Sequence, residues 1–501
     1  MKKTNLTVWR LFLSLCLFVS APGCSKDAGE DSTNTRPKSS EKAITAFSFS
    51  LNGTTVNATI TGTSITATVP HGTAITALTP TITLSAKASI SPQPAQARDF
   101  SKAVTYTVTA EDNSQQTYTV TVSVEALQPL TIDCNNVPAV WEDRGDGIDY
   151  IVSCAIVLKS NKTLTIKPGV RIQFNGEAAG ITISSSDEWL KMVGTAAKPI
   201  LLEGKTATAG SWMGVKQNSK HAENQWEYVT IQHAGAGANN AALFFSDNAY
   251  FLNNSKITIR NCTFKDNKGY GIRDEDNGYS YDRTIFTAFS NNSFSGNTTA
   301  PLCITINEIG SLDAPSNYGT NGNNYIEVHG KSGLRSNVTI PKLSVPYYIF
   351  ESIGLYQKMT VSPGVTMQFH TDAGLNLDKQ YIGKGTFIAN GTAANPIRLV
   401  GYKAGKGVWL GLQLESNDPE ISLNYCTVDG AGSNLHSNAA CVANKKAALN
   451  FGSCDYTAKP VATNCTITNS GGYGIIYKKT AVVNFTGNSY SGNTLANEVT
   501  F

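Results

Sequence analysis

Apolar and polar residues alternate in short runs along most of this 501-residue chain, and turn-forming residues separate the runs. Residues 65–69 (ITATV) and 104–108 (VTYTV) are two examples. A period of two places every second side chain on the same face of an extended backbone, so each run predicts a half-buried β-strand. We find no apolar spacing typical of an amphipathic helix. The sequence therefore predicts an all-β protein.

The chain beyond about residue 130 contains one series of short motifs twice. Residues 164–174 (LTIKPGVRIQF) return as residues 359–369 (MTVSPGVTMQF). Further matched pairs, in the same order in both copies, are 194–200 with 391–397, 212–215 with 409–412, 269–272 with 472–475, and 295–298 with 491–494. Collinear repetition of strand-sized units is typical of a solenoid, in which each coil packs only against its neighbours.

Apolar residues occupy alternate positions in the matched strands. Those that share one face are Val170, Ile172 and Phe174 in the first copy and Val365, Met367 and Phe369 in the second. We expect these six side chains to be buried. Asn and Gly pairs such as Asn291-Asn292 and Gly296-Asn297 separate strands and tolerate the left-handed backbone of a sharp corner. The pattern predicts a right-handed parallel β-helix, because propeller blades would repeat every 40 to 50 residues or so.

Three short sequence motifs in this region resemble those of a known family. They are 212–215 (WMGV), 226–235 (WEYVTIQHAG) and 256–264 (KITIRNCTF). They resemble the β-helix repeats of bacterial surface and secreted proteins in the pectate-lyase-like superfold. The resemblance covers residues 130 to 501 and implies a β-helix, which we assign to residues 127–501. The matched motifs divide it roughly into 130–325 and 326–501. The resemblance implies no activity, because this superfold includes enzymes, adhesins and phage fibres.

The N-terminus predicts export and lipid anchoring. Lys2, Lys3 and Arg10 precede the apolar run 11–19, which is too short to span a bilayer, so residues 1–23 predict a signal peptide. The residues before Cys24 resemble a bacterial lipobox, whose cysteine is acylated. Residues 25–31 (SKDAGED) resemble the acidic signal that sends Bacteroidetes-type lipoproteins to the cell surface. The resemblance implies an outer-membrane lipoprotein that faces the exterior, whereas an ordinary secreted protein is the alternative.

A tether and a small domain follow the anchor. Residues 24–42 are rich in Ser, Thr, Lys and Asp, and they predict a flexible segment. Residues 43–126 predict a β-sandwich of antiparallel strands. The stretches 99–112 and 117–122 resemble an immunoglobulin-like domain of unknown function that follows the anchor in Bacteroidetes surface lipoproteins. The domain offers no titratable cluster for chemistry, which favours a role as a stalk or spacer.

The charge balance excludes nucleic acid as a partner. The full chain has a formal net charge of +3. Loss of the signal peptide removes three of the 40 Lys and Arg residues, and the remaining 37 equal the 37 Asp and Glu residues. A chain without net charge lacks the basic footprint of a nucleic-acid-binding protein.

The cysteines and histidines predict disulfides rather than a metal centre. Cys262, Cys426 and Cys465 lie at inward strand positions, where a free thiol is a small buried apolar group. The plausible disulfides are Cys134–Cys154 and Cys441–Cys454. The six histidines show no paired spacing, so we expect no zinc site and no cofactor. Calcium remains the one possible ion.

Two acidic segments occur in only one copy of the duplication. Residues 141–150 (WEDRGDGIDY) could bind a sugar or calcium, but they are better explained as a cover over the open end of the solenoid. The other, 273–283 (RDEDNGYSYDR), makes a loop about seven residues longer than its matched partner. The candidate ligand-binding residues in this loop are Asp274, Asp276, Tyr279, Tyr281, Asp282 and Arg283.

These observations favour a surface lipoprotein that binds glycan or host matrix without cleaving it. The alternatives are a polysaccharide lyase or glycoside hydrolase, and a purely structural surface protein. The sequence lacks the paired-carboxylate signatures of polygalacturonase-like enzymes. A groove beside the 273–283 loop with two carboxylates, or with a carboxylate and a lysine, would favour an enzyme.

Overall fold

The computed structural model describes residues 36–145, 147–185, 187–245, 255–274, 284–377, 385–416, 418–434, 445–451 and 459–501. The chain forms two compact units, Met1–Glu125 and Ala126–Phe501. Strands account for 45% of the structure and helices for 2%, so the predicted all-β class is confirmed. The helical elements among the described residues are the short 3₁₀ turns η1 (Ile75–Ala77), η2 (Gly237–Asn239) and η3 (Ile309–Ser311).

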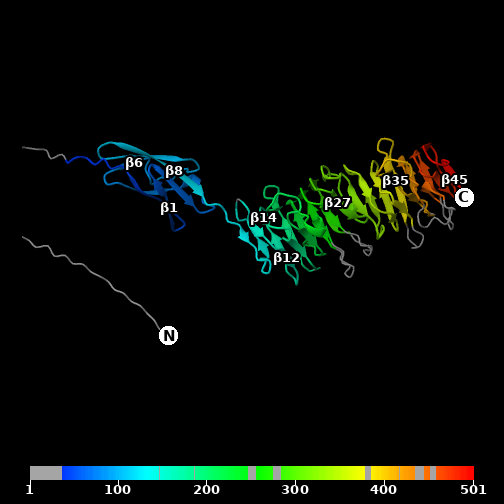
Figure 1. Cartoon of the computed structure of the whole chain (residues 1–501), viewed down its shortest axis with the longest axis horizontal. Helices are drawn as coiled ribbons and strands as arrows, with labels where there is room; N and C mark the ends of the chain where they lie inside the picture. Colours follow the sequence, from blue (N-terminus) through cyan, green and yellow to red (C-terminus); the bar gives the residue numbers. More distant parts are fainter. Residues whose placement is uncertain are drawn as a thin grey trace, which may run out of the picture. The chain divides into compact units, whose positions relative to one another are not determined.

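The first unit contains two small sheets (Figure 1). One has the order β2 (Thr54–Asn57), β1 (Ile44–Leu51), β5 (Pro80–Leu84). The other has the order β3 (Thr59–Thr61), β4 (Ser64–Val69), β8 (Gln115–Val124), β7 (Val104–Thr109), β6 (Ser89–Ser91). All pairs are antiparallel except β4 with β8. Buried rings from both sheets meet in one core, where Phe47 of β1 and Tyr106 of β7 lie edge to face with centroids 6.0 Å apart.

The second unit consists of five parallel sheets, each named here by its first strand. The β10 sheet contains β10 (Val140–Trp141), β13 (Leu164–Ile166), β16 (Leu190–Val193), β19 (Gln225–Glu227), β22 (Ile257–Arg260) and β25 (Phe286–Ser290). The β9 sheet contains β9 (Leu130–Thr131), β11 (Tyr150–Val152), β14 (Arg171–Phe174), β17 (Ile200–Gly204), β20 (Val229–Gln232), β23 (Thr263–Lys265) and β26 (Ser293–Ser295).

The longest sheet runs through both matched halves of the sequence. This β12 sheet contains β12 (Ala155–Leu158), β15 (Gly180–Ile183), β18 (Gly214–Gln217), β21 (Ala241–Phe245), β24 (Tyr270–Asp274), β27 (Ala300–Thr305), β28 (Ile326–His329), β30 (Tyr347–Ile349), β33 (Thr366–Phe369), β36 (Ile397–Gly401), β39 (Cys426–Asp429), β42 (Thr466–Thr468) and β44 (Ser489–Ser491).

Two further sheets complete the later coils. The β29 sheet contains β29 (Val338–Ile340), β32 (Lys358–Val361), β35 (Thr386–Asn390), β38 (Ser422–Asn424) and β41 (Val461–Thr463). The β31 sheet contains β31 (Ile353–Gly354), β34 (Gly374–Asn376), β37 (Gly411–Gln413), β40 (Ala447–Asn450), β43 (Tyr473–Tyr477) and β45 (Glu498–Thr500).

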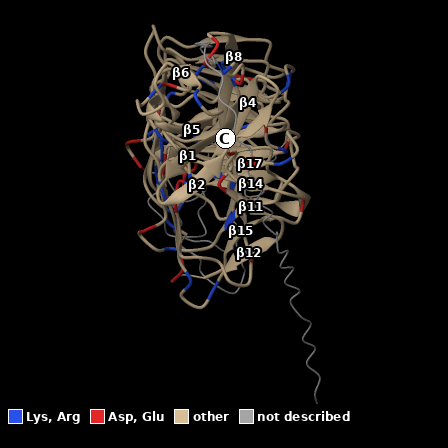
Figure 2. Cartoon of the chain, turned by 90° about the vertical axis from the view of Figure 1, so that its left-hand side faces the viewer, with Lys and Arg blue, Asp and Glu red and all other residues tan. Residues whose placement is uncertain are grey.

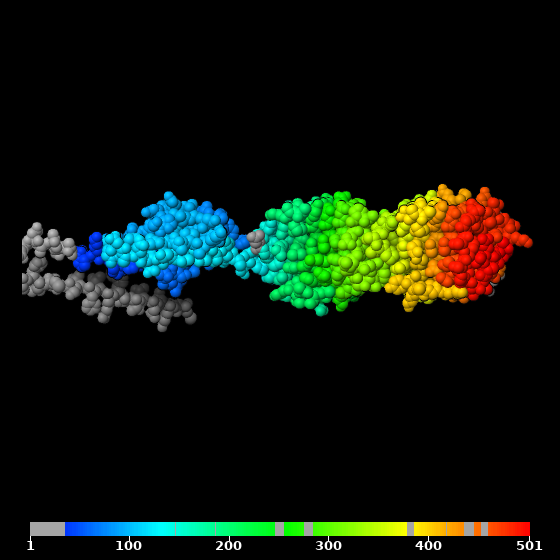
Figure 3. Space-filling view, turned by 90° about the horizontal axis from the view of Figure 1, so that it is seen from above, coloured from blue at the N-terminus to red at the C-terminus, as the bar shows by residue number. Residues whose placement is uncertain are grey.

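The strand order shows that the second unit is a continuous coil. Along most of it, a strand pairs in parallel with the third strand after it, as in β11–β14–β17–β20. The chain therefore visits three sheets in each turn and then stacks on the turn before. In Figure 3 the colour of this unit passes steadily from cyan to red, which shows that segments close in sequence lie in neighbouring coils.

Inward-pointing apolar side chains fill the centre of the coil. Val170, Ile172, Phe174, Val365, Met367 and Phe369 are all buried, so this prediction is confirmed. Phe174 stacks on Trp212 with ring centroids 4.0 Å apart, and Phe369 stacks on Trp409 at 4.1 Å. The matched positions thus make the same contact in both copies.

Asparagine side chains stabilise the corners. Asn267 Nδ2 donates to Asn297 Oδ1 at 2.9 Å, and Asn297 Nδ2 donates to Asn321 Oδ1 at 2.8 Å. This ladder repeats once per coil and satisfies polar groups inside the corner. Asp266 and Asn291 have φ values of 55° and 56°, the left-handed conformation expected at sharp turns.

The two matched halves do not use the same faces of the coil. Strand β14 belongs to the β9 sheet, whereas its sequence counterpart β33 belongs to the β12 sheet. In the same way β15 lies in the β12 sheet and its counterpart β34 lies in the β31 sheet. Strands of the second copy therefore lie one sheet further round the coil than their counterparts in the first copy, so the second copy is displaced by one sheet. As a result, the β12 sheet contains strands from different positions of the repeated sequence.

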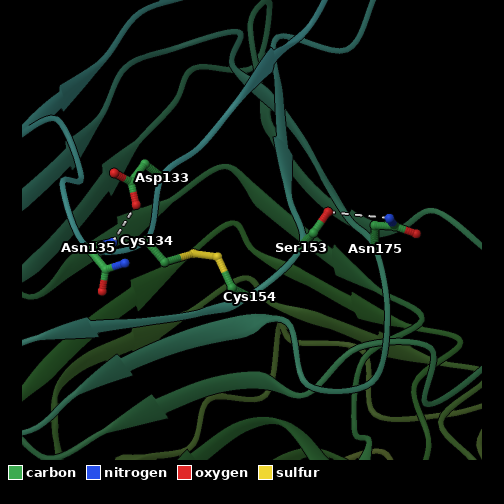
Figure 4. The surroundings of a disulfide bond; sticks show 6 residues. All are labelled: Asp133, Cys134, Asn135, Ser153, Cys154 and Asn175. Atoms are coloured by element: carbon green, nitrogen blue, oxygen red, sulfur yellow. Dashed lines mark hydrogen bonds between the residues drawn. A yellow bond between two sulfur atoms is a disulfide. The ribbon is translucent and has the colours of Figure 1, made fainter.

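One disulfide lies near the start of the coil. Cys134 and Cys154 are bonded and are separated by 20 residues, as Figure 4 shows. Cys262, Cys303, Cys426 and Cys465 are free and buried. The other predicted pair, Cys441 and Cys454, lies outside the described residues.

Truncation of a stacked ring should destabilise the coil. We expect Phe369→Ala to lower the free energy of unfolding by about 3 to 5 kcal/mol, because it leaves a cavity against Trp409. Urea unfolding can be followed by tryptophan fluorescence, since every tryptophan after the predicted signal peptide lies in the second unit. Phe350→Ala, at an exposed position, is the control and should change stability little. Equal stability of the two variants would contradict the inward packing.

The disulfide should contribute measurably to stability. Replacing Cys134 and Cys154 by serine should lower the free energy of unfolding by about 2 to 4 kcal/mol, because a cross-link restricts the unfolded chain. Urea unfolding of the variant should match that of the reduced wild type. An oxidised wild type no more stable than the variant would contradict this role.

Candidate functional site

A row of rings crosses the outer face of the β12 sheet. The inward residues Val328, Ile349, Phe369 and Gly401 are register partners on consecutive strands. The residues that follow them are His329, Phe350, His370 and Tyr402. Successive residues of a strand point to opposite faces, so these four side chains point outward, about 4.8 Å apart from strand to strand.

The rings contact one another and form a surface patch. The centroids of His329 and Phe350 are 4.8 Å apart, and those of Phe350 and His370 are 5.4 Å apart. Tyr348 lies 4.6 Å from Tyr402 and 4.7 Å from Tyr325. We call Tyr325, Tyr348, Phe350, His370 and Tyr402 the aromatic patch.

Two rings of the aromatic patch are well exposed to solvent, whereas Tyr348 is buried beneath them. Phe350 and Tyr402 are each 42% exposed, which is high for large apolar side chains. A hollow of about 200 Å³ lies next to the patch, and it is lined by Phe369, His370, Thr371, Tyr402, Lys403, Gly407 and Val408. Clustered exposed rings beside a hollow are typical of a binding surface.

A second, more polar pocket lies on the same sheet. Its volume is about 230 Å³, and its lining residues are Tyr270, Arg273, Asp274, Cys303, Glu327, His329 and Lys331. The Tyr270 hydroxyl donates to Glu327 Oε2 at 3.0 Å, and His329 Nε2 lies 2.8 Å from Glu327 Oε1. His329 joins this polar pocket to the aromatic patch through its ring contact with Phe350.

The pKa values in the polar pocket follow from burial and pairing. Burial alone would lower the pKa of His329, but hydrogen bonds to Cys303, Glu327 and Glu351 outweigh it and raise the pKa to about 12. Burial raises the pKa of the Cys303 thiol despite the nearby imidazole. Burial and the Cys303 and Glu327 groups raise the pKa of Tyr270.

The residues predicted from the 273–283 loop are only partly described. Asp274 is the last residue of β24 and is 1% exposed, so it lies in the sheet and not in an exposed loop, and its role as a ligand remains a prediction. It is the register partner of Phe245 in β21, and it lines the polar pocket. Asp276, Tyr279, Tyr281, Asp282 and Arg283 lie outside the described residues, and their role remains a prediction.

The other acidic segment packs against the first coils. Trp141 is buried, and the Asp149 carboxylate accepts hydrogen bonds from the backbone N–H groups of Arg144 and Arg171, both at 2.7 Å. Lys198 pairs with Asp143 at 2.9 Å and holds the pKa of that carboxyl below its usual value. The segment thus connects the first coils, and it borders a hollow of about 690 Å³ on the β9 sheet.

Sequence reasoning missed the aromatic patch. The runs Tyr347-Tyr348-Ile349-Phe350 and Val400-Gly401-Tyr402 do show rings at outward positions. The residues of the patch are spread over almost 80 positions of the chain, and only the register of the coils places them side by side. The same register gathers Cys303, Glu327 and His329, although no spacing in the sequence indicated a cluster.

Comparison with known proteins gives one family match. Residues 44–122 match a family model described as "SGBP, N-terminal", in which SGBP stands for surface glycan-binding protein. The first unit of the chain is thus similar to the N-terminal domain of such proteins. No curated protein shows significant similarity to the chain.

Two solved structures show partial similarity. A candidate glycoside hydrolase from Bacteroides thetaiotaomicron VPI-5482 is 33% identical over 21% of this chain and 29% of its own, with a TM-score of 0.17. A candidate secreted protein from Bacteroides fragilis NCTC 9343 is 17% identical over 18% of this chain and 100% of its own, with a TM-score of 0.15. The chain thus spans less than a third of the length of the first structure.

Hydropathy and charge give two further observations on the described residues. Between residues 36 and 501, no described helix has the length and hydropathy to cross a bilayer. Figure 2 shows Lys and Arg interspersed with Asp and Glu along the loops. This mixture agrees with the balanced charge of the chain after its predicted signal peptide.

Proposed function

We propose that the protein is a surface glycan-binding protein that holds a polysaccharide on its aromatic patch without cleaving it. The single observation that carries the proposal is the cluster of rings on the β12 sheet, of which Phe350 and Tyr402 are exposed. The family match of residues 44–122 to the N-terminal domain of surface glycan-binding proteins supports it independently.

The patch has the chemistry that sugar recognition requires. The faces of sugar rings carry apolar C–H groups that pack on aromatic rings, while their hydroxyl groups need hydrogen-bond partners. Phe350 and Tyr402 provide the exposed rings, and Lys403 and Thr371 in the adjoining hollow provide polar groups. Repetition of outward rings on successive strands suits a long polymer, because shallow contacts add along its length.

We also propose a role for each part of the chain. Residues 43–126 act as an immunoglobulin-like spacer, and residues 127–501 form a duplicated right-handed parallel β-helix that presents the binding face. Acylated Cys24 holds the chain on the outer membrane, facing outward. The three-sheet coil and the mainly antiparallel sheets of the first unit support these assignments.

A polysaccharide lyase or glycoside hydrolase is the second candidate. The polar pocket holds Asp274, Glu327 and Lys331 where the 273–283 loop begins, an arrangement that would favour an enzyme. However, both carboxylate oxygens of Glu327 already have partners, Tyr270 on Oε2 and His329 on Oε1. A carboxylate with both oxygens engaged is poorly placed to exchange a proton with a sugar, so the pocket favours binding.

Removal of the exposed rings should weaken glycan binding. A glycan array would first identify a polysaccharide bound by the wild type. For that polysaccharide we expect Phe350→Ala with Tyr402→Ala to raise Kd about 30-fold, because each lost ring contact costs about 1 kcal/mol. Isothermal titration calorimetry measures the change. Val482→Ala with Leu495→Ala removes exposed apolar groups elsewhere and should leave Kd unchanged.

Three results would contradict the proposal and favour another function or another site. Release of reducing ends or unsaturated sugars by the wild type would favour the enzyme. Binding lost in a Tyr279→Ala, Tyr281→Ala variant but kept in the patch variant would place the site on the 273–283 loop. No binding to any polysaccharide on the array would favour a purely structural protein.

Lipid anchoring depends on one cysteine. Because Cys24 is the candidate acylation site, Cys24→Ser should move the protein from the membrane fraction to the soluble fraction. Fractionation of cells and metabolic labelling with a palmitate analogue measure the change. A variant that stays labelled and membrane-bound would show that the chain is held in another way.

A further inference from the structure

We propose that Cys303, Glu327 and His329 bind a divalent transition-metal ion, and that Zn²⁺ fits them best. Each residue offers one ligand atom, and these atoms all lie within 4.8 Å of one another. The cluster lines the polar pocket of about 230 Å³ on the outer face of the β12 sheet. It is separate from the rings that carry the proposed glycan site, apart from the contact of His329 with Phe350.

The register of two adjacent strands brings the three residues together. Cys303 of β27 is the direct register partner of Glu327 of β28. His329 lies two residues after Glu327 on the same strand, so both side chains point outward. The rigid ladder of hydrogen bonds between β27 and β28 therefore fixes the spacing of the three donor groups.

The donor set determines the metal class. Thiolate, imidazole and carboxylate together are typical ligands of Zn²⁺, whereas calcium and magnesium prefer oxygen alone. Three protein ligands beside a pocket leave the fourth position of a tetrahedral ion open to water or to a bound molecule.

Neighbouring side chains orient two of the ligands. The Tyr270 hydroxyl donates to Glu327 Oε2 at 3.0 Å, which leaves Oε1 directed at His329. On the other edge of the imidazole, Nδ1 lies 3.7 Å from Glu351 Oε1, and that oxygen is held by the Gly330 N–H group at 3.0 Å. A carboxylate behind a histidine is the usual support of a metal ligand. A metal ion on the Nε2 side would replace the hydrogen bond between His329 and Glu327.

Cys303 differs from the other free cysteines of the described coil. Cys262, Cys426 and Cys465 belong to the apolar core and contact backbone carbonyl groups. Cys303 instead faces the polar pocket together with a carboxylate and an imidazole. Packing explains the first three thiols, whereas a metal-binding role explains the position of Cys303.

Cobalt is a suitable spectroscopic probe. Metal-free, reduced full-length protein titrated with Co²⁺ should develop a near-ultraviolet thiolate-to-cobalt charge-transfer band, and added Zn²⁺ should remove it. Cys303→Ser should abolish the band, whereas the control Cys465→Ser should retain it. No band in the wild type, or an undiminished band in Cys303→Ser, would overturn the proposal.

Calorimetry with Zn²⁺ tests the other residues. We expect His329→Ala to weaken binding more than about 100-fold, and Glu351→Gln to weaken it about 10- to 100-fold through the lost support. His370→Ala, a histidine outside the cluster, is the matched control and should bind like the wild type. Equal affinities of the two histidine variants would overturn the proposal.

Two further measurements exclude misfolding and keep the metal and glycan proposals apart. Circular dichroism should be unchanged in the near-isosteric Glu327→Gln variant, whose Zn²⁺ affinity should still fall more than about tenfold. Zinc binding is measured without glycan, and glycan binding is measured in the presence of a chelator. Failure of one proposal therefore leaves the other intact.

Discussion

The second unit depends on the burial of one apolar row per strand against the coils on either side. Its backbone N–H and C=O groups pair mainly with neighbouring coils, and rings such as Phe174 and Trp212 stack in the interior. Each coil therefore needs its neighbours for both hydrogen bonds and apolar contacts. The inward residues are constrained by this packing, whereas the outward residues can vary without cost to the core.

That division explains why the candidate sites lie on the outer face. His370 and Tyr402 occupy positions matched by Asn175 and Lys205 in the first copy, so the aromatic patch is not repeated there. The patch forms on strands β28, β30, β33 and β36. They continue a sheet whose earlier strands come from other positions of the repeated sequence. All residues of the aromatic patch except Tyr325 belong to the second half, and Tyr325 at the end of the first half completes it.

The two proposed sites use the same rigid support for different chemistry. Exposed rings suit the apolar faces of sugars, and the polar pocket behind them gathers a thiol, an imidazole and a carboxylate. Parallel pairing keeps outward neighbours about 4.8 Å apart, close enough for rings to touch and for donor atoms to share an ion. In the pocket His329 lies between two carboxylates, those of Glu327 and Glu351.

The sequence by itself determined the all-β class and the buried faces of the strands. Both follow from local periodicity, since the period of two decides which side chains share a face whatever the neighbouring strand is. Even Phe174 and Phe369 could be assigned to the core in this way. Only the tertiary structure decided that the second copy is displaced by one sheet and that Tyr348 meets Tyr402. The geometry of each corner and the length of each loop determine which residues become neighbours across coils. A local sequence pattern does not show how these turns add up along the chain.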